Sequence, residues 1–224
     1  ISNLSIFWEY VWYDTKIKYS KNFNTIVDNE NKMPGANWFS ESKLNFAQNL
    51  LRIKSDKIAI EFYSEDIVQY SLSYNELQDL VSKVSFSLKE MGLKKGDRVA
   101  AVMPNIPETI VLMLASVSIG AIWSSCSPDF GVKGILDRFS QIKPKILFST
   151  EGYYFKGKTI NIIDTIYAVK KTISSIENLV IVPYINNSVP FDFISWSDLI
   201  NNNSNSIIYE QMSFDEPLYI MYSS

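Results

Sequence analysis

Between residues 73 and 149, the spacing of hydrophobic residues alternates between helical and strand-like periods, and this alternation constrains the fold most strongly. Helices are predicted at 73–91, 105–118 and 132–141, and short buried strands at 98–102, 121–125 and 145–149. The connections are short, so the strands must run parallel, with the helices packed on the faces of the sheet. The sequence therefore predicts an α/β fold in which these three strands lie side by side and parallel.

Local signals for the ends of elements agree with this interpretation. Ser73 followed by Glu76 is typical of a capping box, and Gly92 is expected to end the helix that begins there. A strand pair is predicted at 57–63 and 67–72, with the turn at 64–66. Beyond Glu151 the pattern is weaker: it predicts strands at 160–163, 179–183 and 218–222, a helix at 166–173 and a polar loop at 201–206.

Residues 1–52 are predicted to form an N-terminal helical arm, separate from a domain at 53–224. The arm begins with the aromatic segment 7–13, and a second helix is expected at 40–51 behind a Ser40 cap. An exposed aromatic set of this size would favour aggregation. Substantial burial against the main domain is therefore expected for Trp8, Trp12, Trp38 and Phe39.

The residue inventory excludes several kinds of chemistry. The 224-residue chain has no His and one Cys, which excludes an internal disulfide, a structural zinc site and a Ser–His–Asp or Cys–His pair. Twenty-one Lys and Arg against 24 Asp and Glu give a formal charge of -3, which does not favour a nucleic-acid partner. Any chemistry must use carboxylates, cations, hydroxyls or backbone amides, and this points to phosphate or carboxylate activation.

Residues 109–128 carry no charge, and a run of this length is about long enough to span a bilayer. Five serines, Gly120 and Pro128 interrupt it, and no basic cluster flanks it. A buried helix followed by a buried strand is therefore favoured. The first residues lack a basic segment followed by an apolar stretch, so we expect neither a signal peptide nor a membrane partner.

Three segments could carry a site. Residues 124–131 follow a predicted parallel strand, at the edge where open α/β sheets bind ligands, and a plain loop into a helix is an equally good interpretation. The basic residues at 156–158 could hold a phosphate, although an exposed turn is favoured. The apolar run before Ser223 and Ser224 is typical of a strand before a phosphate loop, but the chain contains no complete glycine-rich motif. Cys126 is expected to be a small buried residue rather than a nucleophile.

Motifs along essentially the whole chain resemble those of the acyl-adenylate-forming superfamily, in the same order. Residues 72–77 (LSYNEL) and 92–99 (GLKKGDRV) are similar to its early signatures, and 222–224 (YSS) to the start of its phosphate loop. Residues 35–39 (GANWF) and 44–51 (LNFAQNLL) resemble the arm of its acetyl-CoA synthetase-like enzymes. Within the superfamily, residues 120–131 (GAIWSSCSPDFG) are most similar to the acetoacetyl-CoA synthetases.

This resemblance implies a two-step reaction in the cytoplasm on small-molecule substrates. A carboxylate, acetoacetate, attacks the α-phosphate of ATP carried with Mg²⁺, which gives an acyl-adenylate and pyrophosphate. The thiol of CoA then displaces AMP. A carboxylate is already nucleophilic at neutral pH, so the first step needs alignment and charge neutralisation rather than a His base.

The resemblance also implies site residues. Ser223 and Ser224 would begin the ATP phosphate loop, and the CoA nucleotide would contact Ser127, Pro128, Asp129 and Lys158. Lys158 stands where an Arg is common, so bidentate phosphate pairing is lost.

No catalytic residue and no metal ligand is assigned within this chain. The glycines of the phosphate loop and a mobile C-terminal domain would follow Ser224, so residues 53–224 are expected to be an incomplete AMP-binding domain. The fragment alone is expected to be inactive. The alternatives are another short-chain acyl-CoA synthetase, such as an acetate–CoA ligase, or a non-catalytic binding module that keeps the fold.

Overall fold

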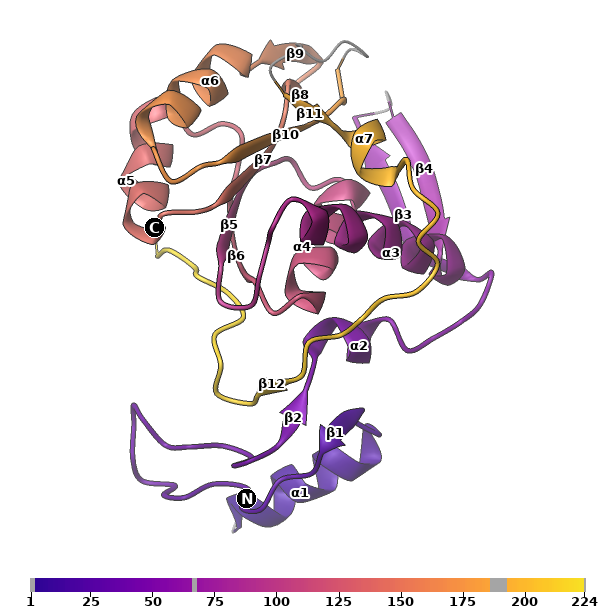
Figure 1. Ribbon diagram of the computed structural model, residues 1–224, viewed down its shortest axis with the longest axis vertical. Coiled ribbons are helices and arrows are strands. Elements are labelled where there is room, and N and C mark those ends of the chain that lie inside the picture. The colour runs from indigo at the N-terminus through magenta and orange to yellow at the C-terminus, as the bar shows by residue number, and fades with distance from the viewer. Residues whose placement is uncertain (1–2, 66–67, 186–192, 224) are drawn as a thin grey trace.

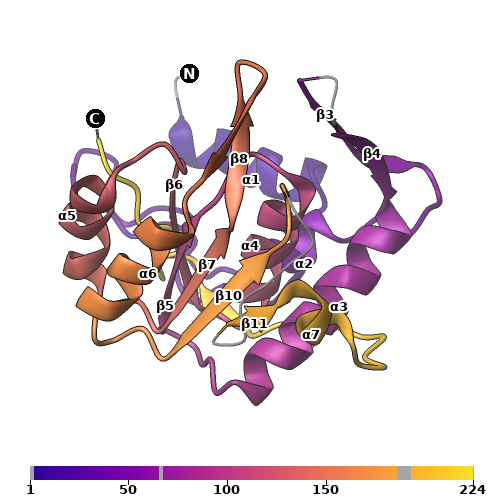
Figure 2. The same cartoon turned by 90° about the horizontal axis from the view of Figure 1, so that it is seen from above.

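A five-stranded parallel sheet forms the centre of the computed structural model, which describes residues 3–65, 68–185 and 193–223. The order is β11-β10-β7-β5-β6, and every neighbouring pair is parallel (Figures 1 and 2). The strands are β5 (Arg98–Val102), β6 (Ile122–Cys126), β7 (Ile146–Thr150), β10 (Asn178–Val182) and β11 (Ile194–Ser195). The predicted α/β class is confirmed, and so is the prediction that β5, β6 and β7 lie side by side and parallel.

Helices cover both faces of this sheet (Figure 2). Alternate strand residues face opposite layers: Phe148 packs in the core beside α3 and α4, whereas its neighbour Leu147 packs in the core beside α5 and α6. The helices are α3 (Tyr74–Glu90), α4 (Pro107–Ser118), α5 (Val132–Ile142) and α6 (Ile163–Thr172). Burial on both faces explains why β5, β7 and β10 are mostly apolar in the sequence.

The predicted start of α3 is confirmed. The Ser73 hydroxyl accepts from Glu76 N–H, and the Glu76 carboxylate accepts from Ser73 N–H at 2.7 Å. The preceding strands, β3 (Ile58–Ser64) and β4 (Val68–Ser73), pair antiparallel as predicted. Part of the predicted turn, Asp66, lies outside the described residues.

The uncharged run at 109–128 is divided between α4 and β6. Within α4, Val111, Leu112 and Ala115 are fully buried. Over the parts of the chain that the structure describes, no helix has the length and apolar character to cross a bilayer. The interpretation as a buried helix followed by a buried strand is confirmed.

The arm contains less helix than predicted. Its elements are α1 (Leu4–Asp14), β1 (Tyr19–Lys21), β2 (Lys43–Leu44) and α2 (Phe46–Leu50). The predicted helix at 40–51 is wrong in its first half, because β2 pairs antiparallel with both β1 and β12 (Met212–Ser213). Asn45 caps α2, and the Ser40 hydroxyl instead accepts from Thr25 N–H at 3.1 Å.

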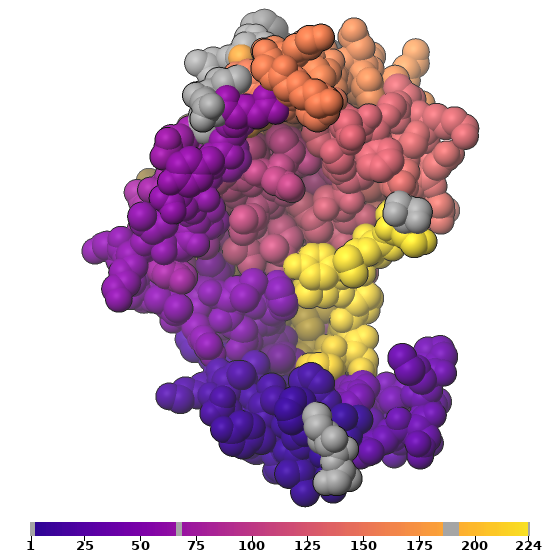
Figure 3. Space-filling model, turned by 180° about the vertical axis from the view of Figure 1, so that it is seen from behind, coloured from indigo at the N-terminus to yellow at the C-terminus, as the bar shows by residue number. Residues whose placement is uncertain are grey.

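The arm aromatics are buried to different extents. Trp12 and Phe39 are 3% and 4% exposed and stack with ring centroids 4.7 Å apart, whereas Trp8 and Trp38 are half-buried. The rings pack mainly within the arm rather than against the main domain, which corrects the prediction. Phe214 makes a ring contact at 4.8 Å to Phe39, and the C-terminal segment lies between the arm and the rest of the molecule (Figure 3).

The last third differs most from the sequence interpretation. β8 (Gly152–Phe155) and β9 (Lys158–Asn161) form an antiparallel hairpin, so the predicted strand at 160–163 ends early and α6 begins. The run at 218–222 makes one parallel bridge, Tyr219 to Trp123, rather than a full strand. The predicted helix at 166–173 corresponds to α6 and the predicted strand at 179–183 to β10, and α7 (Trp196–Ile200) was not predicted.

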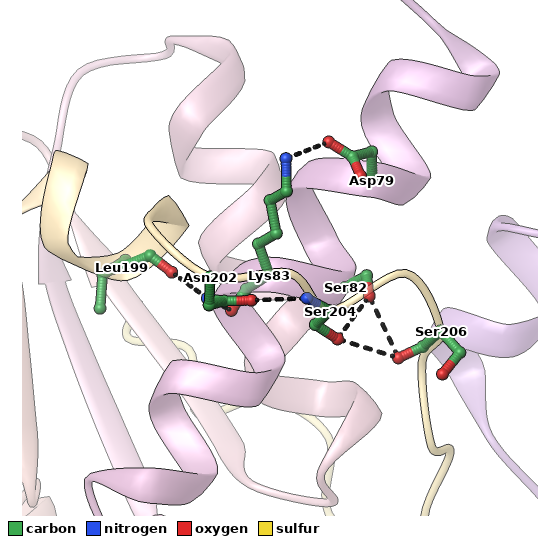
Figure 4. A network of polar contacts seen from close by, with 7 residues as sticks. All are labelled: Asp79, Ser82, Lys83, Leu199, Asn202, Ser204 and Ser206. Carbon is green, nitrogen blue, oxygen red and sulfur yellow. Dashed lines mark hydrogen bonds and ion pairs between the residues drawn. The ribbon is translucent and has the colours of Figure 1, made fainter.

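The polar loop after α7 docks on α3 through its amide and hydroxyl groups (Figure 4). Asn202 Nδ2 donates to the carbonyls of Lys83 and Leu199 at 3.0 Å each. The hydroxyls of Ser82 and Ser204 lie 2.9 Å apart. This segment is therefore held by specific hydrogen bonds although it contains no regular element.

Candidate functional site

A cleft of about 440 Å³ lies at the carboxyl edge of the parallel sheet. Its walls come from the end of β3, the loops after β5 and β6, the β8 strand and Tyr184. The lining residues are Phe62, Tyr63, Ser64, Glu65, Pro104, Asn105, Ile106, Ser127, Pro128, Asp129, Tyr153, Tyr154, Phe155 and Tyr184. Open α/β sheets bind ligands at this edge.

The structure brings Ser127, Pro128 and Asp129 together in this cleft, directly after β6. Pro128 is buried, while Ser127 and Asp129 are exposed. The Cys126 carbonyl accepts from Met103 N–H at 3.3 Å, which ties the loop after β6 to the loop after β5. The loop thus presents one hydroxyl and one carboxylate to the cleft from a fixed backbone.

Lys158 is exposed at the start of β9 and is not among the residues that line the cleft. It pairs with Phe155, which does line it, across a two-residue turn. The turn residues Lys156 and Gly157 have φ of 51° and 71°, as a tight hairpin turn of the primed type requires. The predicted basic turn is therefore the tip of a hairpin beside the cleft.

Sequence reasoning missed the carboxylates that organise this edge. Glu151, 3% exposed, directly follows β7 and accepts from Tyr184 N–H at 2.9 Å and from Ile185 N–H at 3.0 Å. Glu65, at the end of β3, accepts from two amides of the hairpin tip, and these bonds hold the pKa of its carboxyl below the usual range. An acidic residue placed directly after a fully buried strand was the available signal for Glu151.

Tyr184 links three parts of the cleft wall. Its hydroxyl donates to Ser64 Oγ at 2.7 Å, and its ring lies edge-on to that of Tyr154 with centroids 5.2 Å apart. The pKa of Tyr184 is raised, mainly because the side chain is partly buried. The phenol is therefore protonated at neutral pH. The wall therefore offers aromatic faces for a planar group and keeps this hydroxyl as a donor.

Cys126, the last residue of β6, is half-buried, and burial raises the pKa of its thiol to about 12. Arg138 opposes this shift without reversing it. The thiol is therefore protonated at neutral pH, which supports the interpretation that it is not a nucleophile.

The C-terminal segment runs beside β6. Trp123 N–H donates to the Leu218 carbonyl at 3.0 Å, and Ser124 Oγ donates to the Ile220 carbonyl at 2.8 Å. Because the bridge between Tyr219 and Trp123 is parallel, the exposed Ser223 leaves at the same carboxyl edge as the loop after β6. Ser224, the second residue predicted to begin the phosphate loop, lies outside the described residues.

Among the residues that the structure describes, no group of three or more His, Cys, Asp or Glu could hold a metal ion. The cleft combines hydroxyls, aromatic faces and the carboxylates of Glu65 and Asp129, and the hairpin beside it carries Lys156 and Lys158. These groups can bind an anionic or nucleotide-like ligand at the sheet edge.

Comparisons with known proteins agree with this fold. The family model described as AMP-binding enzyme matches residues 47–224. The acetoacetyl-coenzyme A synthetase of Rhizobium meliloti (strain 1021) is 42% identical over 230 residues, which cover 100% of this chain and 35% of that protein. The acetoacetyl-CoA synthetase of Xenopus tropicalis is 38% identical, with 97% of this chain and 34% of that protein covered.

A solved structure of a similar protein has the same fold as this chain. The acetoacetyl-CoA synthetase from Streptomyces lividans superposes with a TM-score of 0.95 at 31% sequence identity, over 100% of this chain and 35% of that one. The chain thus spans about a third of the length of the curated relatives it matches. With the family model covering most of its length and this sheet at its centre, the chain belongs to the AMP-binding enzyme family.

Proposed function

We propose that this chain is the N-terminal part of an acetoacetate–CoA ligase that uses ATP and forms AMP. The observation that carries the proposal is the similarity to acetoacetyl-CoA synthetases along the entire chain, at 42% identity to one relative and a TM-score of 0.95 to another. Similarity over the arm, the sheet and the cleft loops supports a shared reaction more strongly than a shared sheet would alone. The division into an arm at 1–52 and an incomplete AMP-binding domain at 53–224 belongs to the same proposal.

In the proposed reaction, an acetoacetate oxygen attacks the α-phosphorus of ATP, which is carried with Mg²⁺, and pyrophosphate leaves. The thiolate of CoA then attacks the acyl carbon, and AMP leaves with the bonding electron pair. Both steps demand alignment and charge stabilisation more than proton abstraction by a side chain. A chain without His is compatible with that chemistry.

We assign Ser127, Pro128 and Asp129 to the CoA nucleotide, because they line a cleft with aromatic walls at the carboxyl edge. Lys158 is assigned to a CoA phosphate from the hairpin beside that cleft. A Lys offers a point charge rather than the bidentate contact of an Arg.

Ser223, with Ser224, is assigned to the start of the ATP phosphate loop. The assignment is supported by the course of the C-terminal segment, which runs parallel beside β6 toward the sheet edge that holds the residues assigned to CoA.

The test is thioester formation by the intact protein with acetoacetate, acetate or butyrate, together with ATP, Mg²⁺ and CoA. We expect acetoacetate to give the highest kcat/KM, with one AMP and one pyrophosphate per thioester. A preference for acetate would favour an acetate–CoA ligase. Nucleotide binding without carboxylate-dependent ATP–pyrophosphate exchange would favour a non-catalytic module. The proposal places the protein in the cytoplasm, which cell fractionation with an antibody against this chain tests.

A further inference from the structure

The end of β3 and the tip of the β8–β9 hairpin are far apart in sequence but are joined by one side chain. The N–H of Lys156 donates to Glu65 Oε1 at 2.9 Å, and the N–H of Gly157 donates to Glu65 Oε2 at 2.8 Å. Each carboxylate oxygen therefore accepts a hydrogen bond from one of two consecutive backbone amides. We name this contact the Glu65 clasp.

The turn is built to receive an anion. Lys156 and Gly157 both have positive φ, and consecutive amides in such a turn form a concave group of donors that suits a carboxylate. Hydrogen bonds from backbone amides to an ionised carboxylate are stronger than bonds between neutral groups. The clasp is therefore a specific contact rather than a chance approach of two exposed loops.

The base and the tip of the hairpin are held differently. At the base, Ile162 N–H donates to the Glu151 carbonyl at 2.9 Å, and Gly152 packs closely against Ile185. The tip is exposed, with no heavy atom within 4 Å of the position where a side chain would begin on Gly157. Among the hydrogen bonds of the described residues, those to Glu65 are the ones that join this tip to another part of the fold.

We propose that Glu65 is a positioning residue that orders the β8–β9 hairpin, and so places Lys156 and Lys158 beside the carboxyl-edge cleft. The proposal rests on the proposed function in one respect, namely that the anion these lysines meet is a phosphate of CoA. A hairpin ordered in advance loses less conformational freedom when the ligand binds. The clasp thus lowers the KM for CoA by holding the hairpin in place rather than by supplying a bond to CoA.

The direction in which the KM for CoA changes when Glu65 is removed distinguishes a positioning role from simple charge repulsion. Glu65 is an anion near the proposed place of another anion, so its charge alone would weaken CoA binding. If charge dominated, removal of Glu65 would lower the KM for CoA. If the clasp dominates, removal raises that KM.

The first measurement is hydrogen exchange of the peptide containing 152–158, in the intact protein with Glu65→Ala, Glu65→Gln or the control Glu41→Gln. Glu41 is an exposed carboxylate whose partner is the Lys21 side chain rather than a backbone amide. We expect the Lys156 and Gly157 amides to exchange roughly tenfold faster in Glu65→Ala, less so in Glu65→Gln, which keeps one acceptor oxygen, and unchanged in the control. Unchanged exchange in Glu65→Ala overturns the clasp.

The second measurement is kinetic. With Glu65→Ala we expect the KM for CoA to rise several-fold, an intermediate rise with Glu65→Gln, and unchanged ATP–pyrophosphate exchange. Faster hairpin exchange with an unchanged or lower KM overturns the positioning role. If the unaltered protein makes no acetoacetyl thioester, the proposed function fails, and CoA affinity measured calorimetrically on the same variants then decides the positioning role. Absence of CoA binding by the unaltered protein overturns that role as well, and the exchange data still decide the clasp.

Discussion

Replacement of Asn45 by Ala tests how the arm is attached to the main domain. Asn45 is 1% exposed, and its side chain joins three segments. Its Nδ2 donates to the carbonyls of Val117 and Ser118, in the last turn of α4, and to the Glu210 carbonyl at 2.8 Å. Its Oδ1 accepts from Gln48 N–H at 3.2 Å and so caps α2.

The structure sets the size of the expected loss. The Val117 and Ser118 carbonyls keep other donors, Gly120 N–H at 3.1 Å and Glu210 N–H at 2.8 Å, so Ala leaves mainly the Glu210 carbonyl without its partner. An orphaned acceptor costs about 1–2 kcal/mol, and the lost cap costs about 1 kcal/mol. We expect Asn45→Ala to lower the free energy of unfolding by about 2–3 kcal/mol.

Urea unfolding followed by circular dichroism measures this loss of stability. One further variant separates the contribution of the helix cap from that of the amide donor, and another serves as a control. Ser keeps a capping oxygen without the amide donor, so Asn45→Ser is expected to recover about 1 kcal/mol relative to Asn45→Ala. Asn203 is exposed in the polar loop, and Asn203→Ala should stay within about 0.5 kcal/mol of the unaltered protein. The reasoning is refuted if Asn45→Ala is as mild as this control, or if Ser recovers nothing.

Three further predictions concern single side chains. Lys158→Ala should weaken CoA use by about 1–3 kcal/mol and leave ATP–pyrophosphate exchange unchanged; loss of both activities, or of neither, contradicts the assignment. Because burial raises the pKa of Cys126 to about 12, iodoacetamide at pH 8 should modify the native thiol much more slowly than the thiol in urea, and equal rates would contradict its protonated state. The bonds from Ser73 lower the pKa of Glu76, so its contribution to stability is present above the ordinary Glu pKa and is lost as pH falls through the lowered value. Glu76→Gln should therefore destabilise the protein at pH 7 and progressively less as the pH falls below the ordinary Glu pKa, as urea unfolding over a pH series measures.

The central sheet could be predicted because its determinants are local or periodic. Buried strands such as β5 and β10 are mostly apolar runs, and the helices between the strands carry their own boundaries, such as the capping box at Ser73. The arm could not be predicted in the same way. Lys43 and Leu44 become a strand only because Met212 and Ser213 come from the far end of the chain to pair with them. No pattern near Ser40 carries that information.

The candidate site, too, could be predicted from the sequence only in part. Residues 127–129 were found because the carboxyl end of a parallel strand is a general place for ligands. The Glu65 clasp, the Glu151 contact and the Tyr184 bridge were not, because each joins segments whose approach is set by the tertiary fold. At 156–158 the sequence predicts an exposed turn but not the β8 strand before it, because a two-residue turn between two short strands leaves almost no periodic signal.

The carboxylates around the cleft support a positional role for this part of the protein. Glu151 accepts from the amides after β10, Glu65 from the amides of the hairpin tip, and Glu108, in the first turn of α4, from the Tyr70 hydroxyl at 2.6 Å. The bonds from the hairpin amides lower the pKa of Glu65, so its carboxylate is a weaker base than a free one. Under the proposed function this is no disadvantage, because the substrate carboxylate is itself the nucleophile of the first step. Under that function, Glu65 and Glu151 act by fixing backbone segments at the cleft where the substrates are proposed to align.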